Sequence, residues 1–230
     1  MPQFELIGHT DPLLHIRMAH KEVLFAESDA MVMMDTTLDL VGNMRGGPIS
    51  GILRSGAKNE SFFLQKFVAE RGEGEALIAP TNPGGIHLLD IGPAQYCMND
   101  GTFLAMTDNV KINTSMQRLT NAMFGQTGGL LVGKTSGHGK LAVSGHGSVH
   151  EVSISAGTPA IIDNGHVVAW DASLKYEIAL STSKGQGFLS NMFSTATTGE
   201  GIVLQFQGSG KVIICSRNIT TWRKQFGDKK

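Results

Sequence analysis

Short apolar or alternating runs of four to six residues recur along the whole chain, separated by turns rich in glycine, asparagine and aspartate. Runs of this length between turn residues are typical of β-strands, because helices need longer stretches with a 3.6-residue period. The clearest recurring signal is a Gly-x-Gly sequence between two such runs, at residues 72–74, 137–139 and 208–210. We expect each to be the turn of a β-hairpin, with Gly74, Gly139 and Gly210 as equivalent glycines of positive φ.

Two further elements recur upstream of each Gly-x-Gly sequence. A turn of residues that tolerate positive φ occupies 28–29, 108–109 and 163–165, which predicts additional hairpins. Between the two turns of each copy lies an apolar pair, and these pairs are Ile52 and Leu53, Met123 and Phe124, and Met192 and Phe193. Short helices are predicted over residues 115–124 and 187–193.

The recurrence of these elements predicts three divergent copies of one β-rich unit, roughly residues 1–92, 93–156 and 157–222. A dozen or more short strands with almost no long helix indicate an all-β sandwich or barrel. No low-complexity linker separates the copies. We therefore expect a single domain over residues 1–222, followed by a polar tail over residues 223–230.

Composition supports a well-packed protein and argues against one class of partner. Of the 230 residues, 41 % are hydrophobic and 29 are glycine, well above the typical glycine content of about 7 %. The formal net charge is only −1, whereas a nucleic-acid-binding protein normally carries a basic surplus. Lys66, Lys134 and Lys211 do not form one repeated position that could follow phosphates. We therefore expect no nucleic-acid partner.

The sequence also bears on the cellular setting. The longest uninterrupted apolar run, residues 30–34, is far shorter than the roughly 20 residues of a membrane-spanning helix. The first residues show neither a signal peptide nor a transit peptide. Cys97 and Cys215 lie far apart in sequence, which suits buried thiols in a reducing compartment. These features predict a cytoplasmic protein.

Several stretches together resemble the "altered inheritance of mitochondria" family, in its uncharacterised bacterial branch. They are residues 163–169, residues 199–204, and Ala79-Pro80 followed by Pro83-Gly84, and the similarity extends from about residue 4 to residue 217. The resemblance implies a β-sandwich of repeated units in the TRAP-like (tryptophan RNA-binding attenuation protein-like) superfamily. It also implies a link to membrane organisation, because eukaryotic members are tied to the inner mitochondrial membrane. The family has no established catalytic residues, so the resemblance implies none here.

One stretch, residues 128–135, matches the phosphate-binding pattern G-x-x-x-x-G-K-[ST]. A functional loop of this kind follows a strand and opens a helix, so that backbone N–H groups surround the phosphate. The glycine-rich sequence that follows at residues 136–139 is unsuited to a helix, and the repeat pattern makes residues 130–134 a strand. We therefore expect no nucleotide at Lys134.

The histidines raise the question of a metal centre, for which His146, His150 and His166 are the candidates. A cupin-type site needs two histidines at i and i+2 with a downstream glutamate, and the chain contains no His-x-His. On one strand face, His146 and His150 would lie about 13 Å apart unless the chain bends at Gly147. His150 also matches His87 of the preceding copy, which suggests a structural role. We expect hydrogen-bonded or solvated histidines and no cofactor.

Two interpretations of the apolar pairs stay open: plugs that close the core of each unit, or a flexible apolar surface for association. We expect a non-enzymatic structural or protein-interaction module that self-associates, because no triad or paired carboxylates are evident. A trimer is the first expectation, since exposed β-edges favour closed rings; a protein partner or membrane surface is the other possible contact. The alternative is a small-ligand or metal-binding cupin-like protein, or an unrecognised enzyme, with a pocket near His150 or His166.

Overall fold

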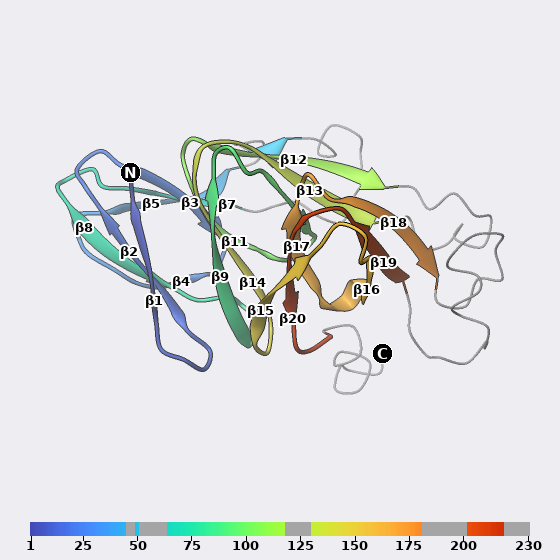
Figure 1. The fold of residues 1–230 in the computed structure, drawn as a ribbon. Helices are drawn as coiled ribbons and strands as arrows, with labels where there is room; N and C mark the ends of the chain where they lie inside the picture. Colours follow the sequence, from blue (N-terminus) through green and yellow to red (C-terminus); the bar gives the residue numbers. More distant parts are fainter. Residues whose placement is uncertain (45–48, 51–63, 118–129, 181–201, 219–230) are drawn as a thin grey trace.

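A computed structural model of the chain describes residues 1–44, 49–50, 64–117, 130–180 and 202–218 (Figure 1). Nearly all of this part is β-structure, distributed over four sheets. Within these ranges there is no α-helix, and the helical element present is one 3-10 turn, η3 (Asn164–His166). The predicted all-β sandwich class is confirmed.

Most of the strands fall into three groups of six along the chain. The first group contains β2 (Leu13–Met18), β3 (Val23–Glu27), β4 (Met31–Met34), β5 (Asp39–Met44), β7 (Leu64–Val68) and β8 (Gly74–Ile78). The second contains β9 (Gly84–Ile91), β10 (Tyr96–Asn99), β11 (Phe103–Thr107), β12 (Val110–Gln117), β13 (Leu130–Gly137) and β14 (Gly139–His146). The third contains β15 (Val149–Ile154), β16 (Ala160–Asp163), β17 (Val167–Asp171), β18 (Lys175–Leu180), β19 (Ile202–Gln207) and β20 (Gly210–Cys215). Two further strands lie at sheet edges: β1 (Gln3–Ile7) beside β2, and β6 (Ile49–Ser50) beside β12.

The three groups share one pairing pattern. In each, the first, sixth and third strands form one antiparallel layer, and the second, fifth and fourth strands form another. The layers are β2-β8-β4 and β3-β7-β5, then β9-β14-β11 and β10-β13-β12, then β15-β20-β17 and β16-β19-β18. Neighbouring groups are joined edge to edge, because β3 pairs with β11 and β10 pairs with β17. Each group is thus a small sandwich that shares a continuous sheet with the next.

The third strand of each group carries the same irregularity. The register against the sixth strand shifts between Met31 and Met33, between Phe103 and Ala105, and between Val167 and Ala169. A β-bulge of this kind increases the local twist and bends the strand. Its position makes Met31, Phe103 and Val167 corresponding residues of the three groups.

One hydrophobic cluster lies mainly within each group, with contributions from the neighbour across the junction. The third cluster is built on aromatic rings: Trp170 is fully buried, with ring centroids 5.2 Å from Tyr176 and 5.7 Å from Phe206, both edge-on. Edge-to-face pairs of this kind each contribute about 0.5–1.5 kcal/mol beyond the area they bury. The shared clusters make the junctions part of the core.

The prediction that the Gly-x-Gly sequences are hairpin turns is wrong. The strands on either side lie in different sheets, so each sequence carries the chain from one layer to the other. The turns at residues 28–29, 108–109 and 163–165 likewise connect strands of different sheets. A strand–turn–strand pattern looks the same in sequence whether the chain reverses within a sheet or turns a corner between two.

The equivalent glycines of positive φ are also different from those expected. The first glycine of each sequence has positive φ, namely +157° at Gly72, +89° at Gly137 and +113° at Gly208. Among the second glycines, only Gly139 shares this property, with φ +142°. The second glycines are instead sites of close approach: a Cβ at Gly74 would lie 2.4 Å from Thr37 Oγ1, and one at Gly210 would lie 3.0 Å from Leu174 Cγ.

Two other expectations meet the structure only in part. The helix predicted over residues 115–124 is wrong at its start, because residues 115–117 belong to β12. Its remaining residues, the helix predicted over 187–193 and the tail at 223–230 lie outside the described residues. The expected unit boundaries at residues 92 and 156 would assign β9 and β15 to the preceding units, whereas the pairing pattern groups each with the strands that follow. The single-domain organisation stays a prediction.

Gly139 offers a direct test of these corners. A Cβ there would lie 2.1 Å from Thr107 Oγ1, which accepts a hydrogen bond from the Lys140 amide at 3.1 Å. Because φ is also positive, Gly139→Ala should lower the free energy of unfolding by about 1–3 kcal/mol. Gly42 is the matched control, since a Cβ there meets nothing within 4 Å. Gly42→Ala should change stability by less than about 0.5 kcal/mol in chemical denaturation. Equal stabilities of the two variants would contradict this account.

Candidate functional site

The six residues predicted as an interaction surface, Ile52, Leu53, Met123, Phe124, Met192 and Phe193, all lie outside the described residues. Whether they act as core plugs or as an association surface therefore stays a prediction. Within the described ranges, a different apolar feature is exposed. It is the edge strand β4.

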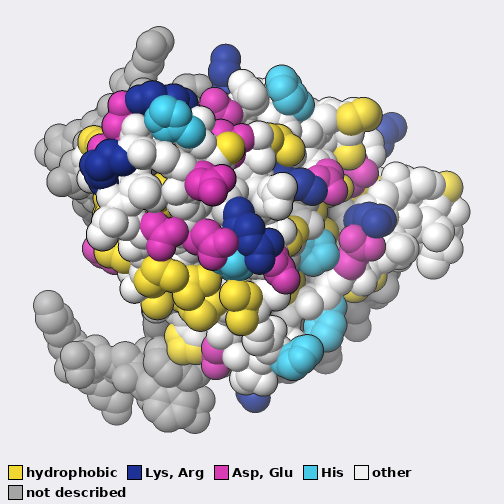
Figure 2. Space-filling model, turned by 90° about the vertical axis from the view of Figure 1, so that its left-hand side faces the viewer, with side chains coloured by type: hydrophobic (Ala, Val, Ile, Leu, Met, Phe, Trp, Pro, Cys, Tyr) yellow, Lys and Arg dark blue, Asp and Glu magenta, His cyan; other side chains and the backbone are white. Residues whose placement is uncertain are grey.

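The side chains of β4 are exposed at positions that are buried in the other two groups. Met31, Val32 and Met33 are 39 %, 53 % and 41 % exposed. Their counterparts at the two internal junctions, residues 103–105 of β11 and 167–169 of β17, are all at most 3 % exposed. β11 and β17 are covered because each pairs with the second strand of the preceding group, whereas β4 ends its sheet. A hydrophobic patch lies beside the charged side chains at this end of the molecule (Figure 2).

The complementary open edge is β16. It is the second strand of the third group and ends its sheet, whereas its counterparts β3 and β10 each pair with the following group. The side chains of Ala160, Ile161 and Ile162 are half-buried. Among the described residues, the series of sandwiches therefore ends in two apolar strands without a partner. An apolar edge with unpaired backbone groups is a natural template for another strand.

The junction between the second and third groups is held by side-chain hydrogen bonds as well as by strand pairing. Asn99 is buried, and its Nδ2 donates to Val167 O at 2.8 Å, Asn164 Oδ1 at 2.9 Å and Asn164 O at 3.2 Å. The Thr102 hydroxyl lies 2.7 Å from Asn99 O and 3.2 Å from Val168 O. These bonds fix the turn after β10 against β17.

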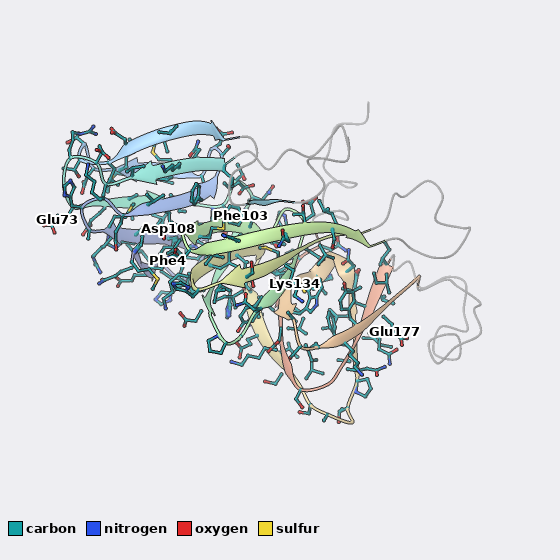
Figure 3. All side chains as sticks on the ribbon, turned by 90° about the horizontal axis from the view of Figure 1, so that it is seen from above. Phe4, Glu73, Phe103, Asp108, Lys134 and Glu177 are labelled. Carbon is teal, nitrogen blue, oxygen red and sulfur yellow. The ribbon has the colours of Figure 1, made fainter. Side chains whose placement is uncertain are left out.

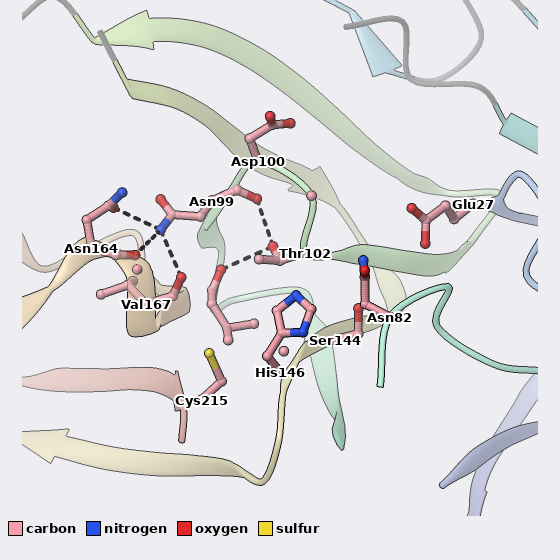
Figure 4. A pocket seen from close by; sticks show the side chains of 14 residues that line it. Glu27, Asn82, Asn99, Asp100, Thr102, Ser144, His146, Asn164, Val167 and Cys215 are labelled. Carbon is pink, nitrogen blue, oxygen red and sulfur yellow. Dashed lines mark hydrogen bonds between the residues drawn. The ribbon is translucent and has the colours of Figure 1, made fainter. Parts of the chain in front are cut away.

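A polar cavity of about 370 Å³ opens beside this junction (Figure 4). Its wall takes residues from all three groups: Glu27 from the first, Asn99, Asp100, Thr102, Ser144 and His146 from the second, and Asn164, Val167 and Cys215 from the third. The Glu27 carboxyl has a raised pKa because burial disfavours its charged form; the nearby Asp29 carboxylate adds to the shift, and a hydrogen bond from Thr81 opposes it. Sequence reasoning missed this site, because its residues are single polar positions far apart in the chain.

The structure does not place the candidate metal histidines together on one strand face. His146 ends β14 and His150 lies in β15, because the chain turns at Gly147 with φ +68°. The expectation of one shared strand is therefore wrong. His166 Nδ1 lies 2.8 Å from Cys215 O, so this histidine is hydrogen-bonded as expected, although η3 stands where a hairpin turn is expected. Across the described ranges, no three histidine, cysteine or acidic side chains are placed to share a metal ion.

The predicted match between His87 and His150 is confirmed by the strand register. His87 lies opposite Val143 and His150 opposite Ile214, at the same distance along β14 and β20 from Gly139 and Gly210. Burial lowers the pKa of His87, an effect that Lys211 reinforces and Glu151 opposes. These charged neighbours lie on β15 and β20 of the adjacent sheet, so His87 faces the boundary between two sheets, as expected for a structural role.

The structure also locates the phosphate-loop-like sequence and the two cysteines. Lys134 and Thr135 lie within β13, so the predicted strand at residues 130–134 is confirmed. Cys97 and Cys215 are free and buried as predicted, and burial raises the pKa of both thiols. No helix within the described ranges is long and apolar enough to cross a membrane.

Comparison with known proteins bears on the identity of this fold. The sequence pattern of the family described as "Mitochondrial biogenesis AIM24" matches residues 4–217, nearly the whole chain. The chain belongs to the AIM24 family. The uncharacterized protein M6_Spy0233 of Streptococcus pyogenes serotype M6 is 34 % identical to this chain over 214 residues, which cover 90 % of this chain and 82 % of that protein.

A solved structure of similar sequence supports the fold. The crystal structure of protein SPYM3_0169 from Streptococcus pyogenes is similar with a TM-score of 0.75 and 30 % identity, covering 98 % of each chain. The family description and these relatives leave the function of the chain open. The TRAP-like assignment and the cytoplasmic location stay predictions from the sequence.

Asn99 gives a test of the junction. Asn99→Asp keeps the shape of the side chain but replaces the donor with a carboxylate facing three oxygen acceptors. We expect the free energy of unfolding at neutral pH to fall by about 1–3 kcal/mol, and by less near pH 4, where the introduced carboxyl group is protonated and donates one bond. Asn109→Asp, in an exposed turn, is the control and should shift stability by less than about 0.5 kcal/mol. Denaturation curves that show no difference between the two variants would remove the junction role of Asn99.

Proposed function

We propose that this AIM24 protein is a non-enzymatic structural module that self-associates by pairing β16 of one copy with β4 of the next. The observation that carries the proposal is the correspondence of these edges to the internal junctions. β16 corresponds in position to β3 and β10, and β4 corresponds in position to β11 and β17. Pairing them would repeat between molecules the contact that the chain makes twice within itself.

The internal junctions predict the register of this contact. Ala26 of β3 lies opposite Ala105 of β11, and Met98 of β10 lies opposite Ala169 of β17. The corresponding residues of the open edges are Ile162 and Met33, and one position along they are Ile161 and Met34. All four side chains are apolar, so the pairing would bury hydrophobic surface in addition to backbone groups.

The two edges of one chain lie far apart, so the proposed contact joins different copies. β4 lies toward the left of Figure 1 and β16 toward the right, and Figure 3 places Glu73 of the first group and Glu177 of the third at opposite ends of the molecule. A contact between two different edges is head-to-tail and produces either a closed ring or a filament. We propose a closed ring of three copies.

The proposed role of such an assembly is argued from the family to which the chain belongs and not from a catalytic group. In this proposal the ring is a scaffold for a protein partner or a membrane surface, in keeping with the link of AIM24 relatives to mitochondrial biogenesis. Pairing of β16 with β4 would join the copies rigidly and at regular intervals, which suits a scaffold. Nothing in this proposal requires a cofactor.

A charge placed on the β4 edge tests the proposal. Val32→Glu would bring a carboxylate into an apolar contact, which opposes association more than folding because the side chain is exposed in the free chain. We expect wild-type protein to show the mass of three chains by light scattering, and Val32→Glu to show the mass of one with an unchanged circular dichroism spectrum.

Val41→Glu is the matched control, since Val41 is also exposed, at 49 %, but lies on β5. It should keep the wild-type mass. A wild-type protein that is monomeric at micromolar concentration would overturn the proposal. So would a Val32→Glu variant that keeps the wild-type mass, or a Val41→Glu variant that loses it while folded.

A further inference from the structure

The polar cavity beside the Asn99 junction has the features of a binding site that the proposed scaffold role does not use. Its volume of about 370 Å³ lies within the range of small-molecule pockets. Figure 4 shows the side chains of Glu27, Asn82 and His146 on one side and those of Asn99 and Asn164 on the other. All of the described lining residues come from one chain, so the site does not require the proposed assembly.

The charge of the wall is one-sided. Glu27 and Asp100 contribute carboxylates, and the described residues that line the cavity include no lysine or arginine. Within the described part of the chain, neither carboxylate belongs to an ion pair. Most of the ion pairs that the sheets do contain join residues of neighbouring strands. Glu27 is half-buried and lies near Asp29, and the hydrogen bond from Thr81 offsets only part of the cost of burying its charge. A cation in the cavity would compensate it.

Two polar residues of the wall, Asn99 and Thr102, donate their hydrogen bonds within the junction and keep oxygen atoms that can act as acceptors. Asn99 is 8 % exposed and uses its Nδ2 within the junction, while its Oδ1 accepts no hydrogen bond from the described residues. The Thr102 hydroxyl is likewise engaged with carbonyl oxygens. Since these groups are held in place before any ligand arrives, a ligand rich in N–H donors loses little free energy to ordering the site.

A single metal ion fits these observations less well. The described residues contain no group of three histidine, cysteine or acidic side chains that converge on one point. The two carboxylates instead belong to different strand groups, on either side of a cavity much larger than one ion. We propose that this cavity binds a small organic cation with N–H donors, of the aliphatic amine class, held between Glu27 and Asp100.

Calorimetric titration with 1,4-diaminobutane tests this proposal on the full-length protein. We expect saturable binding to one site per chain, and no binding of the neutral analogue 1,4-butanediol. Glu27→Gln and Asp100→Asn should each weaken binding by about tenfold or more, because each removes a charge-assisted hydrogen bond. Asp90→Asn is the control: this carboxylate pairs with Lys140 on the sheet face, and the exchange should leave the affinity unchanged.

Several outcomes would overturn the assignment. They are absence of saturable binding, binding that both Glu27→Gln and Asp100→Asn leave intact, equal binding of the butanediol, or displacement of the amine by stoichiometric Ca²⁺. Thermal denaturation of the variants shows that they are folded when the titration is made. Val32→Glu separates this site from the proposed assembly, since it should bind the amine with wild-type affinity whatever its mass.

Discussion

The edge of a β-sheet governs this structure, because every strand at an edge carries backbone N–H and C=O groups that need partners. The chain solves this twice in the same way: β3 pairs with β11, and β10 pairs with β17. Each pairing merges layers of two small sandwiches into one sheet and lets their hydrophobic clusters run into each other. β4 and β16 stand at the same positions without a strand partner among the described residues. The self-association proposed above would give both strands a partner.

The junctions also determine where other features lie. Asn99 ends β10 at the point where the second group meets the third, and its hydrogen bonds reach residues 164 and 167. The same meeting point leaves a cavity, because the end of β3, the turn that follows β10 and the start of β17 converge without filling the space between them. Thus one pattern of strand pairing positions the rigid joint, the polar cavity and the open edges.

The all-β fold class and many of its strands can be predicted from the sequence, because turn residues and apolar runs determine structure locally. The strand at residues 130–134 and the match of His87 with His150 are examples. Pairing partners cannot be predicted in this way, so the local pattern predicts hairpins where the chain turns corners at Gly137 and Gly208. The apolar run at residues 30–34 is visible in the sequence, yet its exposure depends on which strand covers it. Asn99 has no local signal, since its hydrogen-bond partners are more than 60 residues away.

The most direct test of the central claim is the register of the contact between copies. Protein with Met33→Cys is mixed with protein carrying Ile162→Cys and oxidised, so that a disulfide between the two can form only across molecules. Opposed strand residues lie within disulfide reach, so the account predicts an efficient cross-link of the two chains. Met33→Cys mixed with Glu177→Cys, on the other edge of the β16 sheet, should give none. Absence of the first cross-link, or equal yields in both mixtures, would contradict the account.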